Sequence, residues 1–306
     1  APPRSEKKEE TFRRKRRHKI YGRQAGVALF SAIGQGSYYS CPASQSGRKQ
    51  EDRIETDRNN GIKIMNGIYE MADLAIDIEY RAESTRAFLS DYIAKNKDLT
   101  ADFAVRVTEN DRIGERAVAG NVSFGQIERA CILRKIAANL CSSYEGFLLH
   151  ASCVGYRGGA YAFAAKSGTG KSTHARLLKE LLGDELVYVN DDKPFVRLRR
   201  PEDLFYVYGS PWKGKSGLGE NVSMPLRAVC FLRRGKENRI VKIADPSEAI
   251  PLLAENVPAP ENSVQTENLF LLFDLLRKKT SFYLLECNAN VSAAETSFGG
   301  MIKNGS

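Results

Sequence analysis

Apolar runs of strand length recur along the chain from residue 61 onward, and a stretch of helical periodicity separates two of them. The run at 159–164 is almost entirely apolar, as expected of a buried strand, and leucines recur at helical spacing between 173 and 182. Gly183 would end that helix, and another apolar run follows at 186–189. This order of strand, helix and strand predicts an α/β fold.

Further elements are expected on either side of this centre. A strand at 147–154 leads into 159–164 through a glycine-containing turn, so a hairpin should precede the helix. Helical spacing over 126–144 predicts a long amphipathic helix, and 245–248 carries a helix start, with Asp at the cap and Pro first. The other expected elements are strands at 62–64, 74–78, 103–107, 226–232, 239–243 and 282–287, and helices at 84–95 and 261–279.

The segment 165–173, Ala-Lys-Ser-Gly-Thr-Gly-Lys-Ser-Thr, lies between the strand at 159–164 and the helix. It matches the phosphate-binding pattern G-x-x-x-x-G-K-[ST], with Ala in place of the first Gly. Glycines let backbone N–H groups approach phosphate oxygens, Lys171 adds a mobile positive charge, and the Ser172 hydroxyl is placed to bind Mg²⁺. The alternative is a chance match in a Gly- and Ser-rich turn, which the order of strand, motif and helix disfavours. The residues expected at the nucleotide phosphates are Ser167, Gly168, Thr169, Gly170, Lys171, Ser172 and Thr173.

Two adjacent carboxylates, Asp191 and Asp192, follow the strand at 186–189. Beside a phosphate site, one of them would hold Mg²⁺ and the other would accept the proton of an attacking hydroxyl. Without a phosphate loop, the same pair would be interpreted as part of a solvated turn. His150 lies in the expected strand at 147–154, where a lone histidine is either a catalytic candidate or a packed core residue.

The segment 209–221 is rich in glycine and lysine and has the composition of a long functional loop. Lys213 and Lys215 would neutralise charge on a transferring phosphate and so join the nucleotide-binding set. Trp212, the single tryptophan of the chain, would stack on a base or anchor the loop. The alternative is a mobile connector whose lysines are merely solvated, and the sequence leaves both interpretations open.

Taken together, His150, the loop at 167–172 and the pair Asp191-Asp192 resemble the HPr kinase/phosphorylase and ATP-dependent phosphoenolpyruvate carboxykinase superfamily. The segment 209–221 is similar to that of bacterial HPr-kinase-like proteins, and the resemblance covers about residues 120 to 290. It implies an α/β, phosphoenolpyruvate-carboxykinase-like P-loop kinase fold with a mixed, strand-rich sheet, ATP with Mg²⁺, and phosphoryl transfer.

The resemblance also implies a role for each matching residue. Lys171 would contact the β- and γ-phosphates, Ser172 and one aspartate would hold Mg²⁺, and the other aspartate would face the substrate hydroxyl. His150 matches the histidine that the family carries before the loop. HPr kinases have Glu where this chain has Thr173, and neither their C-terminal signature loop nor the arginine-rich segments of the carboxykinases is found. These departures argue against HPr and oxaloacetate as substrates.

The charge of the chain is uneven, and it suggests three regions. Of the net charge of +9, most belongs to residues 1–60, which hold 14 Lys and Arg against 7 Asp and Glu. We therefore expect a disordered basic tail at 1–60, a small α/β lead-in subdomain at 61–120 and the phosphate-loop domain at 121–306. Binding of nucleic acid by this tail is an alternative that we disfavour. A second alternative is that the tail is not native protein, because the first Met of the sequence is Met65.

Composition narrows the class of protein further. No apolar run approaches the roughly 20 residues that a membrane-spanning helix needs, so no membrane partner is expected. The six cysteines lack metal-ligand spacing, and four lie in apolar segments, which indicates reduced core thiols of a cytosolic protein.

The sequence thus predicts a cytoplasmic, ATP- and Mg²⁺-dependent kinase that transfers the γ-phosphate to a hydroxyl of a small molecule or of a peptide or protein serine. Its expected catalytic residues are Asp191, Asp192, His150 and Lys171, and its expected Mg²⁺ ligands are Ser172, Asp191 and Asp192. The competing hypotheses are a nucleotide sensor without turnover and a nucleic-acid binder that acts through its tail. The acceptor and the oligomeric state, a homo-oligomer included, are left open.

Overall fold

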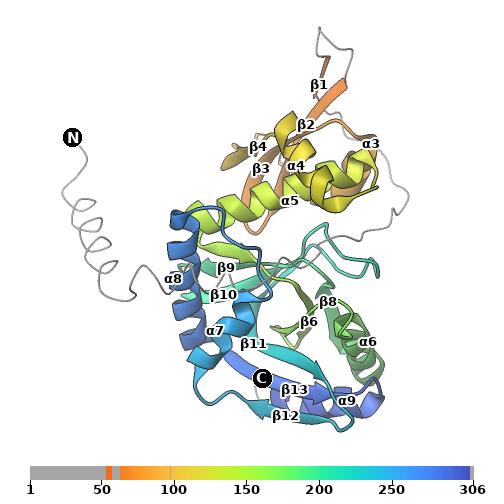
Figure 1. Cartoon of the computed structure of the whole chain (residues 1–306), viewed down its shortest axis with the longest axis vertical. Coiled ribbons are helices and arrows are strands. Elements are labelled where there is room, and N and C mark those ends of the chain that lie inside the picture. Colours follow the sequence, from red (N-terminus) through yellow and green to blue (C-terminus); the bar gives the residue numbers. More distant parts are fainter. Residues whose placement is uncertain (1–52, 57–62, 97, 304–306) are drawn as a thin grey trace, which may run out of the picture. The chain divides into compact units, whose positions relative to one another are not determined.

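The computed structural model describes residues 53–56, 63–96 and 98–303, all of which belong to one compact unit. This part of the chain forms a sheet of nine strands, a smaller sheet of four strands, and helices that pack on both (Figure 1). The expectation of an α/β protein with a mixed, strand-rich sheet is confirmed.

The smaller sheet comes first in the chain, in the strand order β1-β2-β3-β4. Its strands are β1 (Arg53–Thr56), β2 (Lys63–Met71), β3 (Leu74–Tyr80) and β4 (Phe103–Val105). Three helical segments accompany it: α3 (Glu83–Leu89), the 3₁₀ turn η1 (Ser90–Tyr92) and α4 (Glu109–Ala119). The sequence predicted one helix at 84–95 and did not predict α4, although Thr108 and Asp111 form a capping box at its start.

Helix α5 (Phe124–Ser143) connects the two sheets, and it confirms the long helix expected at 126–144. It contacts α3, α4 and β4 of the smaller sheet and also β5 and α8 of the larger one (Figure 1). Its buried residues surround the helix rather than forming one face. One hydrophobic core therefore contains β2, β3 and α5 together with Phe195 and Trp212, and it crosses the domain boundary expected at 120.

The larger sheet has the strand order β5-β9-β10-β11-β7-β6-β8, with β13 beside β11 and β12 beside β13. Strands β7, β11 and β13 are parallel neighbours, and β6 runs antiparallel between β7 and β8. The carboxyl ends of β7, β8 and β11 therefore meet at one edge of the sheet. The strands are β5 (Gly146–Leu148), β6 (Ala151–Tyr156), β7 (Gly159–Ala164), β8 (Leu186–Asn190), β9 (Phe195–Arg199), β10 (Leu204–Tyr208), β11 (Ser223–Arg234), β12 (Arg239–Lys242) and β13 (Ser281–Cys287).

The helices of the larger sheet pack on its faces and edges. Helices α6 and α9 enclose a second core against β6, β7, β11 and β13. Asp245 caps the turn η3 with Pro246 first, as the sequence predicted. The helical segments are α6 (Lys171–Leu182), η2 (Gly183–Glu185), η3 (Pro246–Glu248), α7 (Ala249–Ala254), α8 (Ser263–Lys279), α9 (Val291–Ser297) and the π-helical η4 (Phe298–Ile302).

Two expectations need correction. The single strand expected at 147–154 is two strands, because β5 pairs with β9 while β6 pairs with β7 and β8, and Leu149 and His150 lie in the break between them. The expected tail differs at 53–56, which form β1 and pair with β2, so that Met65 lies inside a paired strand. The rest of the tail lies outside the described residues.

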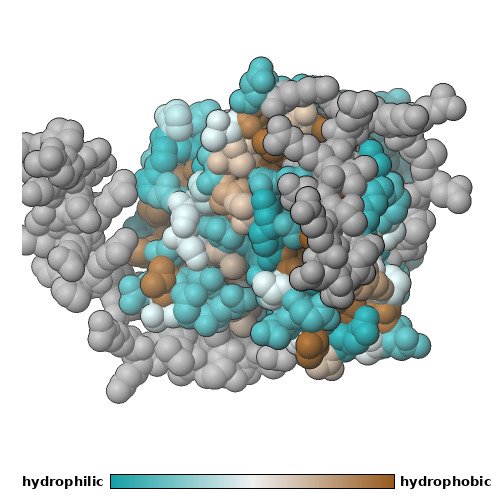
Figure 2. Space-filling view, turned by 90° about the horizontal axis from the view of Figure 1, so that it is seen from above, coloured by the Kyte–Doolittle hydropathy of each residue, from teal (hydrophilic) through white to brown (hydrophobic). Residues whose placement is uncertain are grey.

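The described cysteines are free thiols, as expected. Cys131, Cys141, Cys153 and Cys230 are buried and Cys287 is partly buried, while Cys41 lies outside the described residues. Within the described ranges, none of the helices is both long and apolar enough to cross a membrane. On the face drawn in Figure 2, hydrophobic residues lie in small groups among hydrophilic ones.

A charged contact ties the β2–β3 turn to the larger sheet. Asp73 accepts hydrogen bonds from Arg199 at 2.7 and 3.0 Å and from the hydroxyl of Tyr208 at 2.5 Å. Burial acts to raise the pKa of Asp73, but the hydrogen bonds from Arg199 and Tyr208 outweigh it and lower the pKa. The turn and strands β9 and β10 are therefore held together by a carboxylate that stays ionised.

We expect Asp73→Asn to lower the free energy of unfolding by about 1 kcal/mol at neutral pH, because solvent screens this half-exposed pair. The carboxyl has a lower pKa in the folded protein than its unfolded value of 3.8. Its contribution is therefore present above that value and is lost as the pH falls through the folded one. Urea unfolding of parent and variant from neutral pH into acid checks this, and a stability gap that persists in acid would contradict it.

Candidate active site

The phosphate-binding pattern forms an exposed loop between β7 and α6. Gly168 and Gly170 have positive φ angles of 77° and 119°, which glycine adopts without steric cost. Helix α6 begins at Lys171 with no side chain capping its N-terminus, whereas α4 and α5 have capping boxes. The first N–H groups of α6 lack intrahelical partners, which is the arrangement that binds phosphate at helix N-termini.

Lys171 lies at the centre of this loop. Its side chain is buried, and its ammonium group donates to the carbonyl oxygens of Ala165 at 2.7 Å and Lys166 at 3.5 Å. Burial lowers the pKa of Lys171 to about 8, and the charges of Asp192 and Lys193 act on it in opposite directions. A phosphate that enters the loop would therefore meet this positive charge and the N–H groups of α6 together.

The other predicted loop residues differ in exposure. Ser172, the expected Mg²⁺ ligand, is the second residue of α6 and is partly buried, and Thr173 is exposed. Ser167 and Gly168 are exposed at the tip of the loop, and Thr169 closes a turn by donating its N–H to Lys166 O at 3.2 Å. The segment is thus open to solvent on the side where a nucleotide would approach.

The carboxylate pair follows β8 at the same edge of the sheet. Asp191 is buried, and its Oδ1 accepts a hydrogen bond from the hydroxyl of Ser152 at 2.5 Å. Its Oδ2 has no hydrogen-bond partner among the residues that the structure describes. Asp191 therefore has one oxygen fixed by the protein and one oxygen available to a ligand.

Asp192 lies between two cationic or ionisable side chains. Its Oδ1 is 3.3 Å from His150 Nε2 and accepts a hydrogen bond from Lys193 Nζ at 3.1 Å. Burial acts to raise the pKa of Asp192, but the hydrogen bond from His150 and the charge of Lys193 lower it overall. Burial also lowers the pKa of His150, with Asp192 opposing that shift. At neutral pH, Asp192 is ionised and His150 is neutral.

The turn that carries both aspartates is held by Asn190. Its Oδ1 accepts the backbone N–H groups of Asp192 at 2.9 Å and Lys193 at 2.7 Å, and its Nδ2 donates to Ser210 O at 3.0 Å. Ser210 in turn donates its hydroxyl to Lys193 O at 2.6 Å. The Asn190 side chain thus stabilises the turn that positions both carboxylates.

The segment 209–221 lies along β8 rather than away from it. Asp191 N donates to Leu218 O at 3.1 Å, Glu220 N donates to Val189 O at 3.3 Å, and Gly219 forms a bridge with Asn190. A Cβ atom added at Gly214 would lie 2.9 Å from the Cβ of Asp192, so the loop passes directly against that residue. Backbone hydrogen bonds thus fix this loop beside the carboxylate pair.

The three side chains that drew attention to the loop have different surroundings. Trp212 is buried, with its ring centroid 5.4 Å from Phe88 and 6.4 Å from Phe195, so the anchor is the role observed. The ammonium group of Lys213 is 3.4 Å from Asp91 of η1, and Lys215 is exposed. The expected contact of both lysines with a phosphate stays a prediction.

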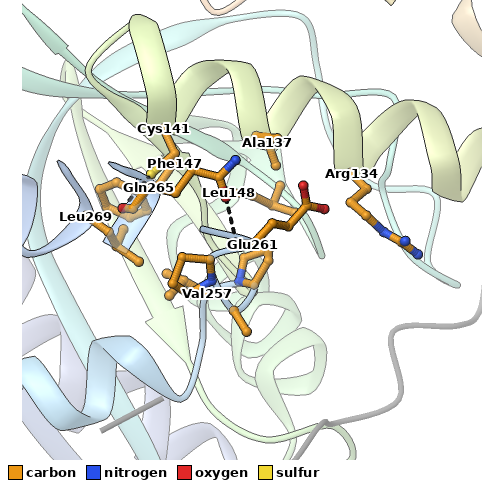
Figure 3. Close-up of a pocket in the computed structure, with 13 residues that line it drawn as sticks. Arg134, Ala137, Cys141, Phe147, Leu148, Val257, Glu261, Gln265 and Leu269 are labelled. Atoms are coloured by element: carbon orange, nitrogen blue, oxygen red, sulfur yellow. Dashed lines mark hydrogen bonds between the residues drawn. The ribbon is translucent and has the colours of Figure 1, made fainter. Parts of the chain in front are cut away.

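His150 is positioned by its backbone as well as by Asp192. Its N–H donates to the carbonyl oxygen of Asn256 at 2.7 Å. The adjoining segments line a pocket of ≈ 40 Å³ whose apolar side chains include Cys141, Phe147, Leu148, Val257 and Leu269 (Figure 3). Gln265 reaches across this pocket and accepts the N–H of Glu261 at 2.8 Å (Figure 3). The pocket is far smaller than the roughly 300 Å³ of ligand sites, so it is a gap in the packing rather than a ligand site.

The sequence analysis missed three residues of this edge. Lys193 is buried and paired with Asp192, and Ser152 holds Asp191. Arg234, at the end of β11, donates from its guanidinium to Gly168 O, with Thr169 O at 3.4 Å. Lys193 follows the aspartates directly and could have been noticed, whereas Arg234 reaches the loop only because β11 pairs with β7.

We expect Arg234→Gln to weaken Mg·ATP binding by about tenfold. The guanidinium of Arg234 donates to backbone carbonyl oxygens of the loop, and it could donate instead to a bound phosphate, whose charge makes the hydrogen bond stronger. Arg233→Gln is the matched control, since Arg233 is an exposed neighbour on the same strand. Calorimetric titration of both variants measures the effect. Equal affinities in the two variants would show that Arg234 has no part in nucleotide binding.

His174, in the first turn of α6, is packed among neighbouring side chains. It is buried, its Nε2 is 2.9 Å from Ser297 Oγ, and its ring packs 4.7 Å from Phe163, centroid to centroid. Burial lowers the pKa of His174 to about 4, so the ring is neutral at physiological pH. It links α6 to α9 and does not face the loop carboxylates.

The residues at this edge fit Mg²⁺ only in a site that a nucleotide completes. Among the described residues, no three His, Cys, Asp or Glu side chains group closely enough to hold a metal by themselves. Mg²⁺ at phosphate loops takes one or two protein oxygens and fills its shell with phosphate oxygens and water. The partly buried Ser172 hydroxyl and the available Oδ2 of Asp191 are donors of that kind.

Comparisons with known proteins give little information about this site. No protein-family model matches the chain, and no curated protein matches it. Among solved structures, the HPr(Ser) kinase/phosphatase from Coxiella burnetii is similar over 43% of this chain and 88% of its own, with 13% sequence identity and a TM-score of 0.22. A likeness of that size carries no argument about function, so the function is argued from the geometry of the site alone.

Proposed function

We propose that this protein is an ATP- and Mg²⁺-dependent phosphotransferase of the HPr-kinase-like class, with a phosphoenolpyruvate-carboxykinase-like P-loop kinase fold. One observation carries the proposal: the phosphate loop with Lys171 and the carboxylate pair Asp191-Asp192 lie at the same edge of the sheet. His150 reaches that edge from the break between β5 and β6, and Arg234 reaches it from the end of β11. Phosphoryl transfer needs this combination of a phosphate cradle, positive charge and a base.

The residues would divide the work according to their surroundings. The N–H groups of α6, with Lys171 and Arg234, would bind the phosphates and neutralise charge that develops on the transferred group. Ser172 and one aspartate would hold Mg²⁺, which when bound supplies further neutralisation of that charge. The other aspartate would accept the proton of the attacking hydroxyl, for which an ionised carboxylate is required.

A nucleotide sensor without turnover is the second candidate. Such a protein needs the loop and Lys171, but it does not need two positioned carboxylates beside them. Here Ser152, His150, Lys193 and Asn190 all make hydrogen bonds or close contacts that orient the pair. These contacts fix the positions of both carboxylates, which favours a catalyst over a sensor. The third candidate, a nucleic-acid binder, depends on residues outside the described ranges and stays a prediction.

The test is transfer of label from γ-labelled ATP under single-turnover conditions. A panel of hydroxyl-bearing metabolites and serine peptides serves as acceptors, and release of labelled phosphate to water is followed in the same reactions. We expect label to appear on at least one acceptor in the presence of Mg²⁺. Binding of Mg·ATP with neither transfer nor hydrolysis across the panel would favour the sensor instead.

A further inference from the structure

A second pocket lies at the opposite edge of the larger sheet, where β7, β11 and β13 begin. Its volume is ≈ 320 Å³, at the lower end of the range of small-molecule sites. Its polar lining consists of Tyr161, Arg227, Lys278, Lys279, Thr280, Ser281 and Tyr283. The phosphate loop follows the far end of β7, so this pocket is separate from the candidate active site.

The lining of this pocket is cationic. Arg227, Lys278 and Lys279 contribute to it, and none of its lining residues is acidic. Lys278 pairs with Asp274 at 2.6 Å and Lys279 pairs with Asp203, so these lysines also have partners outside the lining. Both belong to the last turn of α8, where cations stabilise a helix C-terminus on their own account. Other features must therefore carry the argument for a ligand.

The first of these features is the placement of Arg227. The pairing of β11 with β7 shifts register between Leu226 and Ala228, so Arg227 lies at an irregularity in the sheet. Such bulges redirect a side chain at the expense of the ladder. A Cβ atom at Gly159 would lie 2.7 Å from Arg227 Cγ, so the glycine makes room for the arginine stem. Among the described residues, Arg227 forms no ion pair.

The second feature is an unpartnered buried hydroxyl. Thr280 is only 7% exposed, and in the described part of the chain its Oγ1 has no hydrogen-bond partner. A buried hydroxyl without a partner has lost its hydrogen bonds to water and gained none in return, so it calls for an explanation. Thr280 lines the same pocket as Arg227, and a bound acceptor oxygen would satisfy its hydroxyl.

We propose that this pocket binds a compact multivalent oxyanion, a phosphate ester or a polycarboxylate. Arg227 supplies a planar guanidinium that binds either kind of oxyanion through two parallel hydrogen bonds. Thr280 donates its hydroxyl, and the lining has no acidic side chain that would repel the anion. This inference does not depend on the proposed phosphotransfer, since it uses none of the residues of the loop edge.

Such a site would lie on the strands that carry the active-site edge. Strand β7 starts at the pocket and ends at the phosphate loop, and β11 starts there and ends at Arg234. An anion bound across the starts of these strands would join them at one end while a nucleotide joins them at the other.

The experiment titrates inorganic pyrophosphate and, separately, citrate by calorimetry without Mg²⁺. All proteins carry Lys171→Ala, which weakens anion binding at the phosphate loop. We expect binding of at least one probe, with affinity falling at least tenfold on adding Arg227→Gln and several-fold on adding Thr280→Val. Arg239→Gln, an exposed arginine on the neighbouring β12, is the matched control and should leave the affinity unchanged.

The two probes distinguish the source of the oxyanion. Tighter binding of pyrophosphate would identify the ligand of the pocket as a phosphate ester. Tighter binding of citrate would identify it as a polycarboxylate. No binding of either probe, or binding that Arg227→Gln and Arg239→Gln weaken equally, would overturn the proposal. Thermal melts of each variant verify folding, and Thr280→Val keeps the test decisive because it removes one hydroxyl while preserving side-chain volume.

Discussion

Replacing the two aspartates one at a time should separate binding from turnover. We expect one of Asp191→Asn and Asp192→Asn to weaken Mg·ATP binding, while the other spares binding and lowers turnover by about 10²–10⁴-fold. The reason is that a metal ligand acts before the chemical step, whereas a base acts only in it. Asparagine keeps the shape of the side chain and its hydrogen-bond acceptor but removes the charge that either role requires.

The measurement is paired: nucleotide affinity by calorimetry, and phosphoryl transfer from labelled ATP to the best acceptor found. Asp184→Asn is the matched control, since Asp184 is an exposed carboxylate before β8, on the connection from α6. If both variants bind and turn over like the parent, the carboxylate pair is only a turn and the active-site assignment is wrong. If both variants lower only the affinity for Mg·ATP and no phosphoryl transfer is measurable in the parent, the nucleotide sensor is the better description.

Mg·ATP should stabilise the parent protein, and the effect should depend on Lys171. Ligand at 100 times its dissociation constant adds about 2.7 kcal/mol to the free energy of unfolding. For a folded region of this size that corresponds to roughly 5–10 °C in melting temperature. We expect Lys171→Ala to remove most of this shift, because the buried ammonium group is the cation held inside the loop.

Lys166→Ala is the control for the second experiment, since Lys166 belongs to the same loop but its side chain is 81% exposed. Each variant is compared with and without Mg·ATP, so that changes in the stability of the free protein cancel. Omitting Mg²⁺ should reduce the shift in the parent. The same shift in Lys171→Ala as in Lys166→Ala would refute nucleotide binding at this loop.

Local signals in the sequence were sufficient where one segment determines its own structure. The apolar run at 159–164, the glycines of the loop and the leucine spacing of α6 each act over a few residues, and all three elements formed as predicted. Glycine specifies the loop because positive φ is needed at Gly168 and Gly170, and that requirement is visible in the sequence. The capped start of η3 was visible for the same reason.

Features that depend on a partner strand could not be predicted from the sequence. Strands β9 and β10 were not predicted, and the run at 147–154 was predicted as one strand although its two halves pair with different neighbours. Pairing partners are chosen by the fold, so a continuous apolar run does not reveal where a strand breaks. The break matters for the candidate site because His150 lies in it, beside Asp192.

By itself, the sequence determined which residue types the candidate site contains: a glycine-rich loop with the phosphate-binding pattern, a lysine, and two carboxylates after a strand. Only the tertiary structure decided which other groups join them. Arg234 lies 63 positions beyond Lys171 and reaches the loop because β11 is the parallel neighbour of β7. The same holds for Ser152 on Asp191 and for the second pocket, which Arg227 of β11 lines together with Thr280, the residue before β13. Composition and spacing describe neighbours along the chain, whereas these contacts join residues that are neighbours only after the sheet has formed.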